Sequence, residues 1–194
     1  MEPASPKAIF LDRDGVLNEL VYYPDWGEYE SPRVAADLRL LPGVIPALTA
    51  LLGQGWLLFV VSNQPSYAKG KTTLADLEAV HAAIESMMRE GGIVFSAFYY
   101  DYSHPQSIVP EYAGVSEFRK PNPGSLLRAH REFAIDLGRS WMAGDRDTDV
   151  ECGQRAGCRT ALIRYRHSLD KQGRSQPDLT CDDLPDFVRR LSGA

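Results

Sequence analysis

The sequence has few cysteines, no long apolar run and no excess of basic residues. Its three cysteines, Cys152, Cys158 and Cys181, lack CxxC spacing, which argues against a disulfide framework or an obvious zinc site and is typical of reduced thiols. No run of about 18 apolar residues is present, so we expect no membrane span. The formal net charge of -5 argues against non-specific binding to nucleic acid, because that binding requires a basic face.

The N-terminal segment, MEPASPKAIF, lacks a basic region followed by an apolar stretch. We therefore expect no secretory signal and a cytoplasmic location. Internal repeats and low-complexity tracts are also absent from the sequence. The length of 194 residues with 44% hydrophobic content predicts one globular domain over residues 1–194. A small anionic ligand is still compatible with the net charge, because a few local cations suffice to bind it.

Apolar runs alternate with helical patterns along the chain. Continuous apolar runs predict strands at residues 8–11, 56–61, 94–100, 141–144 and 160–163. Apolar residues at helical spacing predict helices at residues 44–52, 73–89, 123–133, 150–156 and 184–191. This alternation predicts an α/β fold, a Rossmann-like parallel sheet with helices on both faces and no large cap domain.

Two stretches, 19–41 and 101–122, do not follow this alternation. Both have weak periodicity and several prolines, so we predict irregular loops there. Long irregular connections within a compact domain are usually functional or disordered. The first stretch has four aromatic residues between positions 22 and 29, and this content argues against simple disorder.

Polar groups of particular kinds follow the predicted strands. They are Asp12-Arg13-Asp14-Gly15 after residues 8–11, Ser62-Asn63-Gln64 after 56–61, Arg119-Lys120-Pro121 in the loop after 94–100, and Asp145-Arg146-Asp147 after 141–144. In parallel sheets ligands bind beyond the carboxyl ends of the strands. We therefore expect the four groups to converge at one edge of the sheet.

The chemistry of these groups suits a phosphate ester and a divalent cation. Converging carboxylates such as Asp12 and Asp145 repel one another unless a cation joins them, and Mg²⁺ prefers oxygen ligands. Ser62 and Asn63 can donate hydrogen bonds to a phosphate, which carries about -1.5 to -2 charges near neutral pH. Mg²⁺ and Lys120 would offset the repulsion between that phosphate and an attacking carboxylate.

The spacing of Asp12 and Asp14 suits two roles on one substrate. Positions i and i+2 of an extended chain point the same way. One carboxylate can attack phosphorus and form an aspartyl phosphate. The other can protonate the leaving oxygen and then activate water, and such acid–base help is worth roughly 10²–10⁴-fold. A lone DxD is more often a solvated loop, so this interpretation depends on all four groups together.

These motifs resemble those of the haloacid dehalogenase-like (HAD-like) phosphatases. DRDGVLN matches the first motif, SNQ the second, RKPNPG the third and GDRDTD the fourth, in order and over residues 7 to about 163. Within this family, SNQ followed by AKG and the stretch GDRDTDVECGQRAG are most similar to D-glycero-D-manno-heptose 1,7-bisphosphate 7-phosphatases and related histidinol-phosphatases. The resemblance implies a Mg²⁺-dependent phosphatase for a small sugar phosphate, working as a monomer with no nucleic-acid or membrane partner.

The resemblance also implies a role for each motif residue. Asp12 would be the nucleophile and Asp14 the acid–base group. Mg²⁺ would be held by the carboxylates of Asp12 and Asp145 and by the backbone carbonyl of Asp14. Residues that would bind the phosphoryl group or the rest of the substrate are Ser62, Asn63, Arg119, Lys120 and Arg146.

Other functions stay open at this point. The same chemistry could act on histidinol phosphate or another small metabolite. A catalytically inactive binding protein is a different class, although no residue required for catalysis is missing. A P-loop kinase is disfavoured, because Lys69-Gly70-Lys71-Thr72 resembles the end of GxxxxGK[ST] but Pro65 stands where the first glycine belongs.

The chain departs from this group in the loop before RKP. The heptose phosphatases commonly carry a zinc loop there, with a pattern resembling CPHHP followed by CxCRKP. Alignment on His104-Pro105 and on RKP places the four ligand positions at Asp101, Ser103, Ser116 and Phe118. Structural zinc takes four nitrogen or sulfur ligands. We therefore expect no zinc and a loop held by its own packing.

Two sets of aromatic side chains have two possible roles each. Tyr22, Tyr23 and Trp26 lie where the family places a substrate-facing loop, but a packed surface flap fits equally well. Tyr67 would either narrow the pocket or pack against neighbouring side chains.

Overall fold

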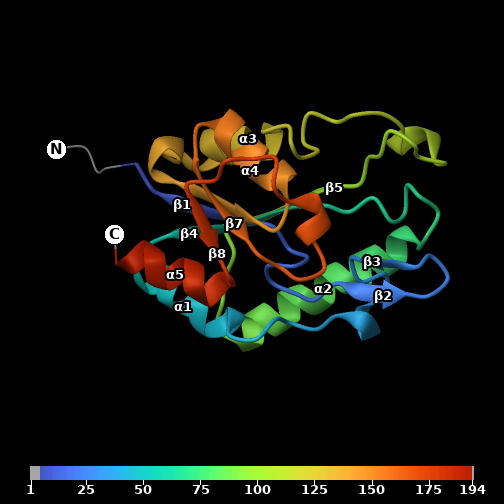
Figure 1. Cartoon of the computed structure of the whole chain (residues 1–194), viewed down its shortest axis with the longest axis horizontal. Coiled ribbons are helices and arrows are strands. Elements are labelled where there is room, and N and C mark those ends of the chain that lie inside the picture. The colour runs from blue at the N-terminus through green and yellow to red at the C-terminus, as the bar shows by residue number, and fades with distance from the viewer. Residues whose placement is uncertain (1–4, 194) are drawn as a thin grey trace.

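The computed structural model describes residues 5–193. The first four residues of the N-terminal segment, in which we expect no secretory signal, therefore lie outside the described residues. Its centre is a six-stranded parallel sheet (Figure 1). In spatial order the strands are β5 (Ala97–Asp101), β4 (Leu57–Asn63), β1 (Ala8–Leu11), β6 (Trp141–Gly144), β7 (Arg159–Ile163) and β8 (Leu179–Cys181). This arrangement confirms the predicted α/β fold without a large cap domain.

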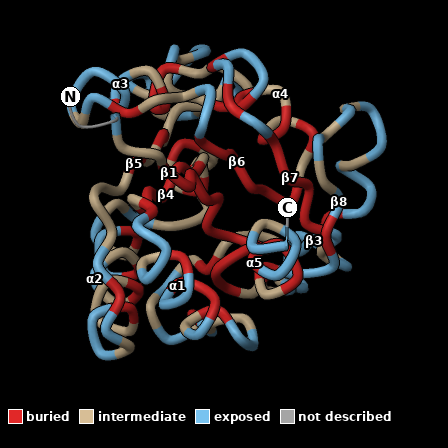
Figure 2. Tube along the Cα trace, turned by 90° about the vertical axis from the view of Figure 1, so that its left-hand side faces the viewer, coloured by how far each residue is buried: buried red, intermediate tan, exposed pale blue. Residues whose placement is uncertain are grey.

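Helices cover both faces of the sheet. On one face lie α1 (Val44–Gly53), α2 (Leu74–Glu90) and α5 (Leu184–Ser192), and on the other lie α3 (Gly124–Phe133) and α4 (Asp147–Ala156). Successive side chains of a strand point to opposite faces. Ile9 and Leu11 accordingly pack with α1, α2 and α5, whereas Ala8 and Phe10 pack with α3 and α4. Figure 2 shows the resulting buried centre, in which the strands are covered by partly exposed helices.

Side-chain caps explain where two of the helices begin. The Thr73 hydroxyl accepts a hydrogen bond from the Asp76 backbone N–H at 3.1 Å, so α2 begins at the next residue, Leu74. Helix α4 begins at Asp147, three residues before the predicted start at Val150. The first turn of α4 is polar, so the apolar pattern does not reveal where the helix begins. The Asp149 carboxylate accepts a hydrogen bond from the Arg146 backbone N–H at 3.0 Å and stabilises that turn.

The stretch 19–41, predicted to be irregular, contains a two-stranded antiparallel hairpin. Its strands are β2 (Val21–Tyr23) and β3 (Glu28–Glu30), and Val21 pairs with Glu30. Each strand has only three residues and none of them is buried, so neither produces the apolar pattern of a core strand. The edge strand β8 was also not predicted, because it too has only three residues. The stretch 101–122 is irregular apart from one 3₁₀ turn at Pro110–Tyr112.

All three cysteines are free and buried. Burial raises the pKa of the Cys152 thiol and of the Cys158 thiol to about 12, and that of the Cys181 thiol to about 11. Within residues 5–193, no helix is long and apolar enough to cross a membrane.

Candidate active site

A cavity of about 500 Å³ lies at the carboxyl ends of the central strands. The residues predicted to be catalytic or substrate-binding all line it: Asp12, Asp14, Ser62, Asn63, Arg119, Lys120 and Arg146. The expected convergence of four motifs therefore occurs. The predicted metal ligand Asp145 is fully buried and close to Asp12.

Three buried carboxylates lie together at this site, and two of them, Asp12 and Asp149, line the cavity. Asp12, Asp145 and Asp149 each place an oxygen within 4.8 Å of the others. Burial is the largest cause that raises the pKa of Asp145, and the charges of Asp12 and Asp149 add to it, so this pKa reaches about 7 although Arg146 lowers it. The Asp145 Oδ1 atom is buried and receives no hydrogen bond from any of the residues 5–193. A hard cation with oxygen ligands fits this carboxylate set and this unpartnered atom.

The backbone and a distant loop hold Asp145 in place. Ser168 donates a hydrogen bond to Asp145 Oδ2, and Gln172 Nε2 donates to the Asp145 carbonyl at 2.7 Å. Gly15 has a φ of +83°, and a Cβ there would lie 2.4 Å from Asp145 Oδ2. Glycine at this position therefore permits both the turn after Asp14 and the close approach of Asp145.

Lys120 places its positive charge beside two of the three carboxylates. Its Nζ lies 2.9 Å from Asp12 Oδ1 and 2.7 Å from Asp149 Oδ1, and it donates to the Val61 carbonyl at 2.7 Å. Burial alone would lower the pKa of Lys120, but Asp12 and Asp149 raise it above its ordinary value. The amide of Asn63 exchanges two hydrogen bonds of 3.0 Å with the Lys120 backbone, and these bonds position the lysine.

The Asp14 carboxylate is surrounded by hydrogen-bond donors. Its Oδ1 accepts from Arg13 and from Asn18, whereas its Oδ2 accepts from Gln64 and from Ser31. Burial alone would raise the pKa of Asp14, but the Arg13 guanidinium and the hydrogen bonds lower it below its ordinary value. Asp14 therefore differs from Asp145, whose buried carboxyl group favours the protonated form.

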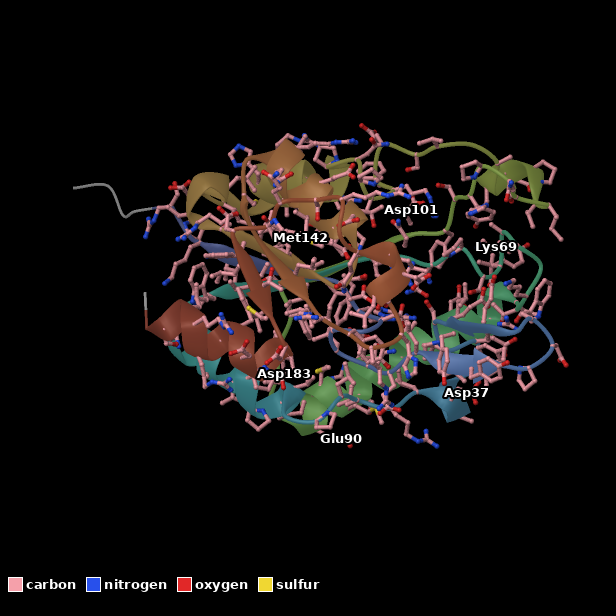
Figure 3. All side chains as sticks on the ribbon, in the orientation of Figure 1. Asp37, Lys69, Glu90, Asp101, Met142 and Asp183 are labelled. Carbon is pink, nitrogen blue, oxygen red and sulfur yellow. The ribbon has the colours of Figure 1, made fainter. Side chains whose placement is uncertain are left out.

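The hairpin β2–β3 forms one wall of the cavity and Lys69 forms part of another. Glu28, Tyr29 and Glu30 line the cavity, and the Tyr29 ring stacks on His167 with a centroid distance of 3.6 Å. In Figure 3, Lys69 lies between the hairpin and the loop that follows β5. Burial, together with Lys71 and Arg119, lowers the pKa of Lys69.

The aromatic side chains whose roles the sequence left open are not among the residues that line the cavity, and Tyr22 and Trp26 are about half exposed. Tyr67 lies edge-on to Tyr112 with a centroid distance of 5.5 Å. The Tyr23 hydroxyl bonds to Asp37, and the Lys71 ammonium lies 4.1 Å from the Trp26 ring. Tyr29, one residue of the same hairpin, is the aromatic side chain of that stretch that reaches the cavity.

The loop 101–122 is held by hydrogen bonds and aromatic contacts. Ser103 donates to Asp101 Oδ1 from its backbone N–H at 3.0 Å, and His104 donates from its backbone to the Tyr112 carbonyl at 2.9 Å. Arg119 NH1 donates to the Ser103 carbonyl at 2.6 Å. These contacts agree with the expected loop that is held by packing, and they place Arg119 at the cavity wall.

Comparisons with known proteins place the chain in a family. A family model described as HAD-hydrolase-like matches residues 117–187. The chain is 35% identical to the D-glycero-D-manno-heptose-1,7-bisphosphate 7-phosphatase of Thermosynechococcus vestitus, over 91% of each chain. The chain belongs to the HAD-like phosphatases. This membership confirms the resemblance and the enzyme class, a phosphoric monoester hydrolase.

Two further relatives of this HAD-like phosphatase agree. It is 32% identical to the D-glycero-beta-D-manno-heptose-1,7-bisphosphate 7-phosphatase of Escherichia coli K12, over 96% of this chain and 94% of the relative. The D,D-heptose 1,7-bisphosphate phosphatase from B. bronchiseptica, solved as a complex with magnesium and phosphate, superimposes with a TM-score of 0.79 at 26% identity, covering 96% of this chain and 98% of that one.

Several residues that contact the motif side chains of this HAD-like phosphatase were not assigned a role from sequence, among them Asp149, Gln64, Ser31 and Ser168. Asp149 and Gln64 lie inside the fourth and the second motif, so their membership of these motifs was a usable signal. Ser31 and Ser168 lie in segments without a pattern, and their contacts arise only when the chain folds back onto Asp14 and Asp145.

Proposed function

We propose that this protein is a Mg²⁺-dependent phosphatase that removes the 7-phosphate from D-glycero-D-manno-heptose 1,7-bisphosphate. The observation that carries the proposal is the triad of buried carboxylates, Asp12, Asp145 and Asp149, beside Lys120 at the base of the cavity. The names of the relatives support the heptose substrate over histidinol phosphate. The net charge of -5 supports a protein without a nucleic-acid partner, and we propose a single-domain cytoplasmic monomer.

The reaction would proceed in two steps. In the first, an Asp12 carboxylate oxygen bonds to phosphorus, the bond from phosphorus to the sugar oxygen breaks, and that oxygen takes a proton that originates on Asp14. In the second, water attacks the aspartyl phosphate, and its proton returns to Asp14 as the bond from Asp12 to phosphorus breaks. The products are inorganic phosphate and the dephosphorylated sugar.

The carboxylates of Asp12 and Asp145 and the Asp14 carbonyl would hold Mg²⁺, which supplies positive charge to the transferred phosphoryl group. The donor-free Asp145 Oδ1 supports this assignment. Lys120 and Ser62 would bind the phosphoryl oxygens. Asp149 keeps the Lys120 ammonium beside Asp12, because its carboxylate lies 2.7 Å from Nζ.

The basic residues of the cavity wall suit an anionic sugar, whereas Glu28 and Glu30 of the hairpin give another part of the wall negative charge. Lys69, Arg119 and Arg146 supply positive charge around a cavity of about 500 Å³, a volume within the usual range for small-molecule sites. A second phosphate on the sugar would be accommodated by such a wall better than a neutral group. Both anomers of the heptose bisphosphate are therefore tested as substrates.

Phosphate release from a panel of phosphorylated metabolites, with Mg²⁺ and with EDTA, tests the proposal. The panel contains both anomers of the heptose bisphosphate, histidinol phosphate and several hexose phosphates. We expect Mg²⁺-dependent release with the highest kcat/KM on a heptose bisphosphate. Asp12→Asn should abolish turnover and leave the thermal unfolding transition in place. Release that is independent of Mg²⁺, or full activity in Asp12→Asn, contradicts the mechanism, and preference for histidinol phosphate contradicts the substrate.

A further inference from the structure

The hairpin β2–β3 reaches the acid–base group through one residue, Ser31. This serine follows β3 directly, lines the cavity and donates from Oγ to Asp14 Oδ2 at 2.9 Å. The preceding residue, Glu30, forms ion pairs with Lys71, at 2.5 Å, and with Arg33. The position of Ser31 is therefore supported by the ion pairs of the residue before it, whose charged partners are largely shielded from solvent.

The Asp14 carboxylate has no free site for a proton. An ionised carboxylate offers about four lone-pair sites. Five donor atoms occupy those of Asp14, namely Arg13 Nε at 3.3 Å, Arg13 NH2 at 3.1 Å, Asn18 Nδ2 at 2.9 Å, Gln64 Nε2 at 2.6 Å and Ser31 Oγ at 2.9 Å. A proton can therefore be accommodated on this group only if one donor reverses its role or leaves.

Among these partners, Ser31 is the one that can reverse. Guanidinium and amide nitrogens only donate, whereas a hydroxyl donates and accepts. The Gln64 amide is held in its orientation because its Oε1 accepts from Arg13 NH2 at 2.8 Å. The Asn18 amide nitrogen also donates to the Glu19 carbonyl at 2.9 Å, which holds that side chain as a donor too. Protonated Asp14 can therefore donate its proton to Ser31 Oγ.

We propose that Ser31 is a catalytic residue that relays the proton between Asp14 and the leaving oxygen; this inference rests on the proposed phosphatase reaction. As the bond between phosphorus and the sugar oxygen breaks, that oxygen takes the proton of the Ser31 hydroxyl, and Ser31 Oγ takes the proton of Asp14. In the second step water gives a proton to Ser31 while Ser31 returns its own to Asp14. Each step conserves protons and leaves Ser31 a neutral hydroxyl.

The relay is tested with two substrates that differ in their need for a proton. The alcohol oxygen of a sugar phosphate requires protonation as it leaves, whereas 4-nitrophenolate leaves without it. The measured quantity is kcat/KM, because it reports the steps up to transfer of the phosphoryl group to Asp12 and excludes hydrolysis of the intermediate. For Ser31→Ala we expect kcat/KM on the heptose bisphosphate to fall by about tenfold or more, a fraction of the value of acid–base catalysis. On 4-nitrophenyl phosphate it should fall by less than about threefold.

The ratio of the two kcat/KM values separates catalysis from folding, because a loss of active protein lowers both values equally. Ser31→Thr, which keeps a hydroxyl, should restore most of the sugar-phosphate activity. Ser86→Ala removes a hydroxyl from α2 that bonds to Glu90, and should leave both values unchanged. Asp14→Asn should show the same selective loss as Ser31→Ala.

Two outcomes overturn the relay. An unchanged kcat/KM on both substrates in Ser31→Ala means that Asp14 transfers its proton directly. An equal loss on both substrates means that Ser31 only supports the structure. Absence of phosphate release by the wild-type protein, by contrast, overturns the proposed function itself.

Discussion

Replacing Lys120 by methionine removes the cation that lies among the buried carboxylates. The Lys120 side chain is almost fully buried, and its Nζ lies within 2.9 Å of Asp12 and 2.7 Å of Asp149. Removal of one partner from a buried ion pair costs about 3–5 kcal/mol, because the remaining charge stays buried without a counter-charge. At about 2–4 °C per kcal/mol for a chain of this size, we expect Tm in EDTA to fall by about 6–20 °C.

Thermal unfolding followed by circular dichroism measures this loss. Mg²⁺ should narrow the difference between Lys120→Met and wild type, because it offsets the same carboxylates. Arg128→Met is the matched control, since Arg128 pairs with Glu132 on the exposed side of α3 and its loss should leave Tm nearly unchanged. A fall of less than about 2 °C for Lys120→Met would refute the argument that this lysine balances the buried carboxylates.

Further predictions concern the metal site. Mg²⁺ should raise Tm of the wild type and raise that of Asp145→Asn much less, and equal shifts would contradict the assigned ligand. In EDTA the free energy of unfolding should fall as the pH rises from about 4 to about 7. The reason is that the pKa of Asp145 is raised to about 7 in the native state, which therefore keeps a proton that the unfolded state releases. Urea titrations across this range measure the slope, and Asp145→Asn should flatten it. Gly15→Ala should weaken Mg²⁺ binding measured by calorimetry, since its Cβ would lie 2.4 Å from Asp145 Oδ2. Elemental analysis should find far less than one zinc per chain, and stoichiometric zinc would contradict the expected loop.

The sequence was informative where its signal is periodic or repeats a motif. The strand at Ala8–Leu11 and that at Trp141–Gly144 have the predicted bounds, because continuous apolar runs describe strands that are buried on both faces. The motifs at the ends of these strands then located the cavity, because parallel strands bring their carboxyl ends to one edge.

The sequence was uninformative where contacts are made between segments without a pattern. The hairpin strands are short and contain no buried residue, so their pairing produces no alternation of apolar and polar residues. Ser31 lies in a segment of charged and proline residues. It contacts Asp14 only because the hairpin folds against the loop that follows β1. Asp149 was visible in the fourth motif, but its pairing with Lys120 depends on the approach of a loop from another part of the chain.

The three buried cysteines have a practical consequence for following the hairpin in solution. A thiol reacts as its thiolate, and burial with a raised pKa keeps these three sulfurs protonated and inaccessible. A cysteine placed at the exposed turn of the hairpin by Asp25→Cys would therefore be modified long before the native ones. A single fluorophore or spin label can thus be attached to the hairpin without first removing a native cysteine, and its signal would report directly on how the hairpin responds to metal and substrate.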